Sequence, residues 1–281
     1  MGEEMIPEPQ RTYLLELLAT LGPAAEGLIL VGGQAARFMV AKPRATRDLD
    51  FVLDVALLRG STTSLASVLA ELGYSPVDNA RNFQFEKPIP GLGQAMRVEF
   101  LASAEFSRKN DIRVDVQDGI HGRASVGASI VVAETDEREI SGSLPHGTPA
   151  KFYIRITRPH ALTMLKLIAM DERYRNIRGS EHRDHDREEA RTHASDIIAI
   201  ISARPDVRDF RGRFAAQFGK DVELKTRIYE IIRSYFGEQG SPGLVLYSEA
   251  LIREDARASV RDLSGELRRA QRLVSFLALE V

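Results

Sequence analysis

The chain of 281 residues contains no cysteine. This absence excludes disulfide bonds, thiol nucleophiles, cysteine-ligated zinc and iron–sulfur clusters, and it fits a reducing compartment. Proline and glycine are sparse, at 12 and 21 residues, and 43% of the residues are hydrophobic, which excludes disordered and collagen-like chains. No run approaches the ~18 apolar residues that a membrane span needs. The N-terminus also lacks the apolar segment of a signal peptide. We therefore expect a cytoplasmic globular protein with no membrane partner.

The net charge of -2 conceals an uneven distribution along the chain. Residues 1–150 carry 14 basic and 20 acidic side chains, residues 151–220 carry 15 and 10, and residues 221–281 carry 9 and 10. An acidic half followed by a basic segment is typical of a carboxylate metal site beside a surface that attracts phosphate groups. By itself the pattern does not outweigh chance variation on a solvated surface, so the interpretation depends on motifs.

The hydrophobic periodicity changes character near residue 158. Before this point, short apolar or alternating segments predict strands, at 27–31, 48–54, 82–86, 96–101 and in several short pieces within 111–157. Helical spacing in this half predicts helices at 11–21, 34–40 and 61–72, the last with Ser61 as its N-cap. Beyond residue 158 the spacing is helical throughout, with helices expected at 159–176, 187–203, 206–218, 221–236, 245–257 and 259–279. The sequence therefore predicts an α+β protein, with a mixed-sheet domain at residues 1–157 and an all-helical domain at residues 158–281.

Two consecutive glycines, Gly32 and Gly33, follow the apolar strand expected at 27–31 and precede a helix. Glycine lets a backbone approach a ligand closely, and the first turn of a helix offers N–H groups and the positive end of a dipole. This arrangement predicts a seat for a phosphate group.

Two carboxylates, Asp48 and Asp50, lie on the next strand at positions i and i+2. Because side chains alternate along a strand, both aspartates project from the same face. Their mutual repulsion is unfavourable unless a cation lies between them. Hard oxygen ligands at this spacing suit Mg²⁺ or Mn²⁺, which also bridges nucleotide phosphates.

A third carboxylate from a neighbouring strand completes such a metal site, and two residues compete for this role. Glu99 lies within an otherwise apolar strand, where burial without a partner is costly. Asp115 is the rival, in the segment IRVDV at 112–116. We favour Glu99 because its strand is the more apolar and lies nearer in sequence to the Asp48 strand. One of the three acids then accepts the proton of an attacking hydroxyl.

The segments GGQAA at 32–36 and RATRDLDF at 44–51 together resemble the first motif of the DNA polymerase β-like nucleotidyltransferase superfamily, in its bacterial branch of AbiEii and MenT toxins. The resemblance extends over about residues 28–201. It includes KLIAMDER at 166–173, similar to the Lys-(x)6-Arg helix of this branch, and HASDI at 193–197, similar to its later helix with an aspartate.

This resemblance implies a role for each matching residue. Asp48 and Asp50 bind the catalytic metal, Thr46 and the glycine turn contact the triphosphate, Lys166 contacts nucleotide phosphates, and Asp196 supports the site. The residues expected to be catalytic are Asp48, Asp50, Glu99, Lys166 and Asp196. The residues expected at the nucleotide are Gly32, Gly33, Gln34, Thr46, Arg47, Lys166 and Arg173.

The sequence also departs from the family pattern at two places. Many superfamily members have serine after the turn glycine, whereas this chain has Gln34, so a hydroxyl contact to phosphate is missing. The charged segment 181–189 contains Asp184 and Asp186, which compete with Asp196 for the place of the later aspartate. Lys166 and Arg173 also fit an ordinary solvated helix face.

The sequence thus predicts a metal-dependent enzyme that moves a nucleoside monophosphate from an NTP to an acceptor hydroxyl. If the resemblance extends to biology, the acceptor is RNA, a tRNA 3′ end being favoured, and the protein is the toxin partner of an antitoxin. Two alternatives stay open: modification of a small molecule such as an antibiotic, and a non-catalytic nucleotide-binding module of the same fold.

Overall fold

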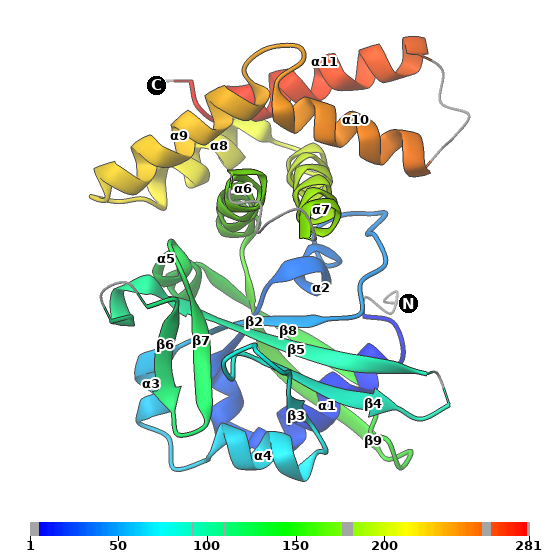
Figure 1. Ribbon diagram of the computed structural model, residues 1–281, viewed down its shortest axis with the longest axis vertical. Helices are drawn as coiled ribbons and strands as arrows, with labels where there is room; N and C mark the ends of the chain where they lie inside the picture. The colour runs from blue at the N-terminus through cyan, green and yellow to red at the C-terminus, as the bar shows by residue number, and fades with distance from the viewer. Residues whose placement is uncertain (1–5, 92, 109–110, 176–181, 255–259, 280–281) are drawn as a thin grey trace. The chain divides into compact units, whose positions relative to one another are not determined.

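The computed structural model describes residues 6–91, 93–108, 111–175, 182–254 and 260–279. The chain divides into two compact units, Met1–Arg158 and Pro159–Val281. The first unit is a sheet with helices, and the second is helical (Figure 1). The result is a mixed α/β protein, consistent with the expected α+β class.

The first unit combines short helices with a mixed sheet. Its helices are α1 (Gln10–Leu21), α2 (Gly32–Ala36), α3 (Val55–Arg59), α4 (Leu65–Glu71) and α5 (Ala128–Ala133), with 3-10 turns η1 (Gly22–Gly27) and η2 (Ala104–Phe106). Its strands are β1 (Leu28–Leu30), β2 (Leu49–Leu53), β3 (Ser75–Pro76), β4 (Gln84–Ile89), β5 (Gln94–Ser103), β6 (Arg113–Gln117), β7 (Ile120–Ser125), β8 (Thr135–Ser143) and β9 (Pro149–Thr157).

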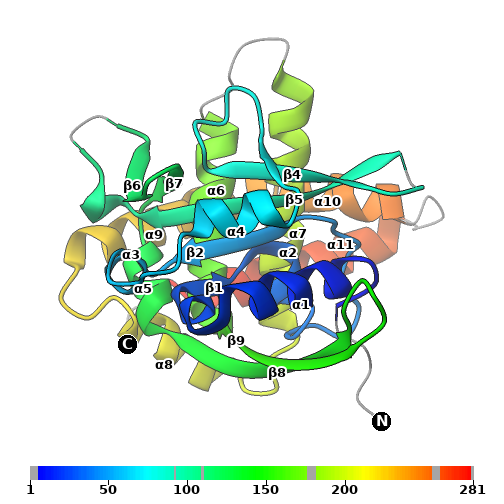
Figure 2. The same cartoon turned by 90° about the horizontal axis from the view of Figure 1, so that it is seen from below.

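Within the described residues, these strands form one sheet in the order β3-β4-β5-β2-β1-β9-β8. The β6–β7 hairpin joins this sheet beside the end of β5. Strand β2 pairs antiparallel with β1 and parallel with β5. Helices α1 and α4 lie on one face of the sheet (Figure 2), whereas α2 lies on the other (Figure 1). Strand β2 is thus central, and α2 lies close to it.

The two central strands present different chemistry on their two faces. On one face, Phe51 of β2 and Phe100 of β5 are opposite one another and fully buried, with ring centroids 6.3 Å apart. On the other face, the same register places Asp50 opposite Glu99. The apolar face anchors these strands in the core, so the polar residues between the buried ones are held at fixed positions.

The sequence predictions for the first unit were wrong in several local details. Helix α4 begins at Leu65 with Ser64 as its N-cap, because the Ser64 side chain accepts the N–H of Ser67, so Ser61 is not the cap. Helix α5 interrupts the region 111–157, which was expected to hold strands and turns only. Helix α3 was not expected. It follows β2 directly, and Asp54 caps it by accepting the N–H of Leu57.

The second unit contains helices alone among its described residues. They are α6 (Pro159–Arg175), α7 (Arg183–Ser202), α8 (Val207–Ala216), α9 (Val222–Phe236), α10 (Pro242–Glu254) and α11 (Val260–Phe276). Helices α6 and α7 lie side by side (Figure 1), and buried apolar residues on α9 and α11 complete the core. Helix α7 begins earlier than predicted, so most of the charged segment at 181–189 forms its first turns; Glu181 lies outside the described residues.

None of the described helices combines the length and the apolar character that crossing a lipid bilayer requires.

Candidate active site

The glycine turn after β1 packs directly on Asp50. Gly32 has φ 65°, a left-handed conformation that glycine adopts without strain. A Cβ atom at this position would overlap the carboxylate of Asp50. The backbone N–H of Val31 also donates to the carbonyl oxygen of Asp50 at 2.9 Å. Glycine is therefore required here both by conformation and by the closeness of the carboxylate.

The second glycine, Gly33, meets the loop that carries Thr46. A Cβ atom at Gly33 would lie 2.8 Å from Cγ2 of Thr46. Gln34 is fully buried and its Nε2 donates to the carbonyl oxygen of Thr46 at 3.1 Å. The Gln34 side chain therefore holds the loop against the turn, and the contact of Gln34 with a nucleotide stays a prediction.

Helix α2 is shorter than the sequence suggested, with five residues from Gly32 to Ala36. Such a short helix has a small dipole, so the expected phosphate seat depends on the N–H groups of its first turn. Arg44 and Arg47 are exposed on the neighbouring loop, and Arg37 donates to the carbonyl oxygen of Arg44 at 3.1 Å. The turn thus lies beside cationic side chains that suit a polyphosphate.

Asp48 and Asp50 occupy the N-terminal end of the central strand β2. Asp48 directly precedes the strand, Asp50 is its second residue, and both are partly exposed. Their spacing places the two carboxylates on one face, which Leu49 and Phe51 do not share. Asp50 thus contacts the turn at Gly32 and presents its charge at the edge of that turn.

Glu99 lies opposite Asp50 in the register of β2 and β5, and both of its carboxylate oxygens have partners. Oε1 accepts from Nε of Arg123 at 3.1 Å, and Oε2 accepts from Nε2 of Gln84 at 2.9 Å. The Glu99 side chain is 20% exposed. Glu99 is therefore near Asp50, as expected, but it is held by a guanidinium and an amide.

Asp115, the rival third carboxylate, lies elsewhere in the sheet. It is on β6, which pairs with β7 and not with β2 or β5. Its exposed carboxylate forms an ion pair with Arg108 at 3.1 Å and lies 3.2 Å from Nε2 of His121. The strand order therefore places Glu99, and not Asp115, beside Asp50.

The possible ligands at this site determine how well it fits a divalent cation. Among the described residues, no group of three or more Asp, Glu or His side chains is arranged to hold a metal ion. Asp48 and Asp50 are hard oxygen ligands on one face, which fits Mg²⁺ or Mn²⁺ completed by phosphate oxygens and water. A three-carboxylate site with Glu99 is not assembled, because Arg123 and Gln84 engage that side chain.

In the second unit, Lys166 and Asp196 form a buried ion pair. Nζ of Lys166 donates to Oδ2 of Asp196 at 2.6 Å, and the two side chains are 5% and 9% exposed. The alternative of a solvated helix face is thus wrong for Lys166. Because both charges have left water, each needs the other, and removing one leaves a costly buried charge.

The other candidates on α6 and α7 have different partners. Arg173 donates to Oδ1 of Asp186 at 3.3 Å, and Asp186 is fully buried. Asp184 is exposed. Lys166 therefore pairs with Asp196, whereas Asp186 pairs with Arg173, and the match of one of these aspartates to the later family motif stays a prediction.

Two residues that bind the Glu99 carboxylate were not predicted from the sequence. Gln84 and Arg123 come from β4 and β7, which both pair with β5 on the side away from β2. The rule that a partly buried carboxylate needs a partner predicted that one exists, but 24 positions of sequence separate Glu99 from Arg123. Only the pairing of strands identifies them.

A glycine turn packed on an Asp-x-Asp strand, in the middle of a mixed sheet, is the arrangement of polymerase β-like nucleotidyltransferases. The comparison with protein families agrees with this class. The family model for the nucleotidyl transferase AbiEii toxin of type IV toxin–antitoxin systems matches residues 14–277, so the chain belongs to this family. It is an NTP-using nucleotidyltransferase of a toxin family. No curated protein matches the chain.

Proposed function

We propose that this enzyme transfers a nucleoside monophosphate from an NTP to a hydroxyl group of RNA, with a tRNA 3′ end as the favoured acceptor. The observation that carries the proposal is the packing of the Asp50 carboxylate on Gly32, because it brings a ligand for a divalent cation onto a turn suited to phosphates. Asp48 lies on the same face and supplies the second carboxylate.

In the proposed reaction, the acceptor oxygen forms a bond to the α-phosphorus and the bond to the bridging oxygen of the β-phosphate breaks, so pyrophosphate leaves. Mg²⁺ or Mn²⁺, when bound, neutralises charge on the phosphates and on the leaving group. Asp48 and Asp50 would hold this ion. The N–H groups of the glycine turn and the basic loop orient the triphosphate, which is the main requirement of phosphoryl transfer.

Glu99 is proposed to accept the proton of the hydroxyl group without being a ligand of the metal ion. Glu99 lies opposite Asp50, and the bond from Arg123 holds its carboxylate in one orientation. Lys166 of the second unit is proposed to bind the nucleotide phosphates while it also keeps its ion pair with Asp196. The basic segment 151–220 is proposed to contact the acceptor.

The membership of a type IV toxin–antitoxin family supports a cognate antitoxin as a partner of this chain in the cell. Expression of the wild-type chain is expected to arrest growth, and expression of an Asp48→Asn/Asp50→Asn variant is not. This follows because toxicity in the proposal comes from the transfer reaction.

The proposal is tested by incubating the protein with each α-labelled NTP, Mg²⁺ or Mn²⁺, and total RNA, total protein or a panel of hydroxylated antibiotics. The test variant is Asp48→Asn/Asp50→Asn. The matched control is Asp115→Asn, because Asp115 is an exposed carboxylate that lies away from β2. We expect label in RNA with wild type and control, and none with the double variant.

Other outcomes decide against the proposal. Label found only in a small hydroxylated compound would show that the acceptor is a small molecule and not RNA. Binding of NTP without transfer to any acceptor would identify a nucleotide-binding module. Equal labelling by wild type and by Asp48→Asn/Asp50→Asn would show that the two aspartates are not needed for nucleotide transfer.

A further inference from the structure

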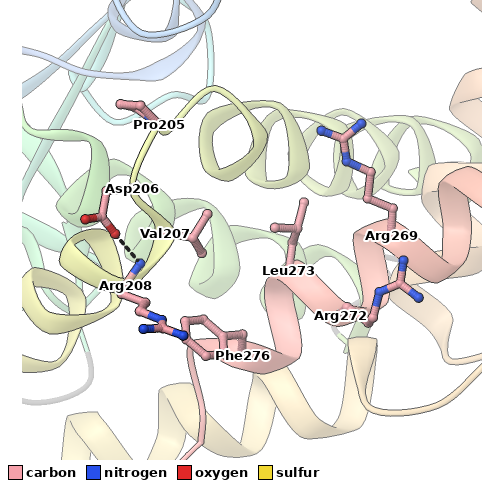
Figure 3. A pocket seen from close by; sticks show the side chains of 8 residues that line it. All are labelled: Pro205, Asp206, Val207, Arg208, Arg269, Arg272, Leu273 and Phe276. Carbon is pink, nitrogen blue, oxygen red and sulfur yellow. Dashed lines mark hydrogen bonds between the residues drawn. The ribbon is translucent and has the colours of Figure 1, made fainter.

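A pocket of about 420 Å³ lies in the second unit between the start of α8 and the last turns of α11 (Figure 3). It is built from two segments that are far apart in sequence. The residues that line it are Pro205, Asp206, Val207, Arg208, Arg269, Arg272, Leu273 and Phe276. We call it the arginine pocket. Its volume falls in the range of about 300–1,000 Å³ that is usual for small-ligand sites.

Three guanidinium groups surround the arginine pocket. Arg208, Arg269 and Arg272 are exposed, and within the described part of the chain none of their side chains has an ion-pair partner. Arg187 and Arg191 of α7, by contrast, both pair with Glu249. Unneutralised arginines around one concavity concentrate positive potential there.

One acidic residue, Asp206, also lines the pocket, and its carboxylate caps the N-terminus of helix α8. Its Oδ1 accepts the N–H groups of Arg208 at 2.8 Å and Asp209 at 3.0 Å, which makes it the N-cap of α8. These backbone hydrogen bonds lower the pKa of Asp206 below its ordinary value, so it is ionised at neutral pH. The three arginines and this aspartate leave the lining with an excess of positive charge.

The remaining lining is apolar and includes an aromatic ring. Val207, Leu273 and Phe276 face the pocket together with the arginines. The guanidinium of Arg211 lies 4.5 Å from the ring centroid of Phe276, a cation–π contact that holds the ring. The pocket thus combines a cationic rim with a flat apolar surface.

We propose that the arginine pocket binds an unpaired nucleotide of an RNA strand, outside the site of nucleotide transfer. The phosphodiester groups lie on Arg208, Arg269 and Arg272, because guanidinium matches phosphate oxygens in charge and in geometry. The base lies against Phe276 and Leu273, because a base has an apolar π-face that stacks on aromatic side chains. A single nucleotide carries both features, which is the combination that the pocket presents. The inference rests on the proposed function for its choice of RNA.

The test measures RNA binding directly, without NTP, by fluorescence anisotropy of a labelled single-stranded RNA oligonucleotide over a series of salt concentrations. The test variant is Arg269→Gln/Arg272→Gln. The control is Arg268→Gln, because Arg268 is also exposed on α11 but does not line the pocket. We expect the double variant to bind about tenfold more weakly at moderate salt, with a salt slope reduced by about one to two. The control should stay within about twofold of wild type.

A second variant, Phe276→Leu, tests the base contact separately. Leucine keeps the surface apolar but removes the ring, so affinity for RNA should fall several-fold while the salt slope stays that of wild type. Far-ultraviolet circular dichroism and thermal unfolding of each variant establish that it is folded.

Unchanged RNA affinity in Arg269→Gln/Arg272→Gln would overturn the inference. It is also overturned if wild type prefers a polyglutamate peptide of equal length to the RNA and loses that preference in the same variant, because the pocket then serves an acidic protein segment. A failure of the proposed function is distinguishable. In that case wild type transfers no nucleotide to RNA, yet RNA binding still depends on Arg269 and Arg272.

Discussion

Glu99 lies directly opposite Asp50 across the parallel β2–β5 pair, but its carboxylate is bonded to the guanidinium of Arg123. A cation built into the protein therefore binds the carboxylate that faces Asp50, from the side of β5 opposite β2. Arg123 both orients Glu99 and opposes the approach of a second positive charge.

Replacing Arg123 by glutamine should strengthen the binding of Mn²⁺ in the absence of nucleotide. Removal of the cation frees a carboxylate oxygen of Glu99 and lowers the repulsion felt by the ion, an effect of about 1 kcal/mol, or roughly fivefold in Kd. Isothermal titration calorimetry or Mn²⁺ electron paramagnetic resonance measures this without reference to activity. Arg138→Gln is the control, because Arg138 is exposed on β8. An unchanged or weaker Mn²⁺ affinity in Arg123→Gln would contradict the prediction.

Gly32→Ala should abolish nucleotide transfer and destabilise the protein. The substitution strains a residue at φ 65° and drives a methyl group into the carboxylate of Asp50. The backbone strain alone costs about 1–2 kcal/mol. Gly147→Ala separates the two effects, because Gly147 has φ 83° and a Cβ there would meet nothing within 4 Å. Urea unfolding and the transfer assay should show both variants destabilised, with transfer lost in Gly32→Ala only.

Lys166→Met should destabilise the helical unit by about 3–5 kcal/mol, because it leaves the carboxylate of Asp196 buried without its cation. The Lys166→Met/Asp196→Asn variant removes both charges and should recover a large part of this loss. Chemical denaturation of the two single variants and the double variant gives the coupling between the residues. The recovered protein should still fail to transfer nucleotides. Additive losses in the double variant would argue against a buried pair, and recovered activity would argue against a role at the phosphates.

Glu249→Gln should destabilise the contact between α7 and α10 by about 1–3 kcal/mol at pH 7. Glu249 accepts from Arg187 and Arg191, with Nε of Arg191 at 3.1 Å, and the hydrogen bonds from Arg187 are the largest cause that lowers the pKa of Glu249 below its ordinary value. A lowered pKa means that the carboxylate stabilises the fold above its unfolded-state pKa of about 4.3, and that this contribution is lost as the pH falls through the folded pKa.

The stability difference between wild type and Glu249→Gln should therefore narrow below about pH 4, as thermal unfolding across a pH series would reveal. Glu230→Gln, a change at an exposed position of α9, serves as the control and should have a small effect at every pH. A difference that stays constant into acid would mean that the ionised carboxylate is not the stabilising group.

The sequence alone determined those features that depend on neighbouring residues. The two-residue period of a strand places Asp48 and Asp50 on one face, and the apolar run before Gly32 and Gly33 sets where the turn falls. The same local logic predicted the helices of the second unit to within a few residues. Positions of caps and short helices were less determined, because several serines or short apolar runs compete for each one. For this reason Ser64, and not Ser61, caps α4.

The tertiary structure decided every relationship between residues that are far apart in the chain. Glu99 faces Asp50 because β5 pairs with β2, and it is bonded to Arg123 because β7 lies on the other side of β5. Lys166 is buried because α6 packs on α7, which no charge count reveals. The arginine pocket depends on the meeting of α8 with α11. Local periodicity determines on which face of a helix or strand a side chain lies. Strand order and helix packing determine which group that side chain contacts.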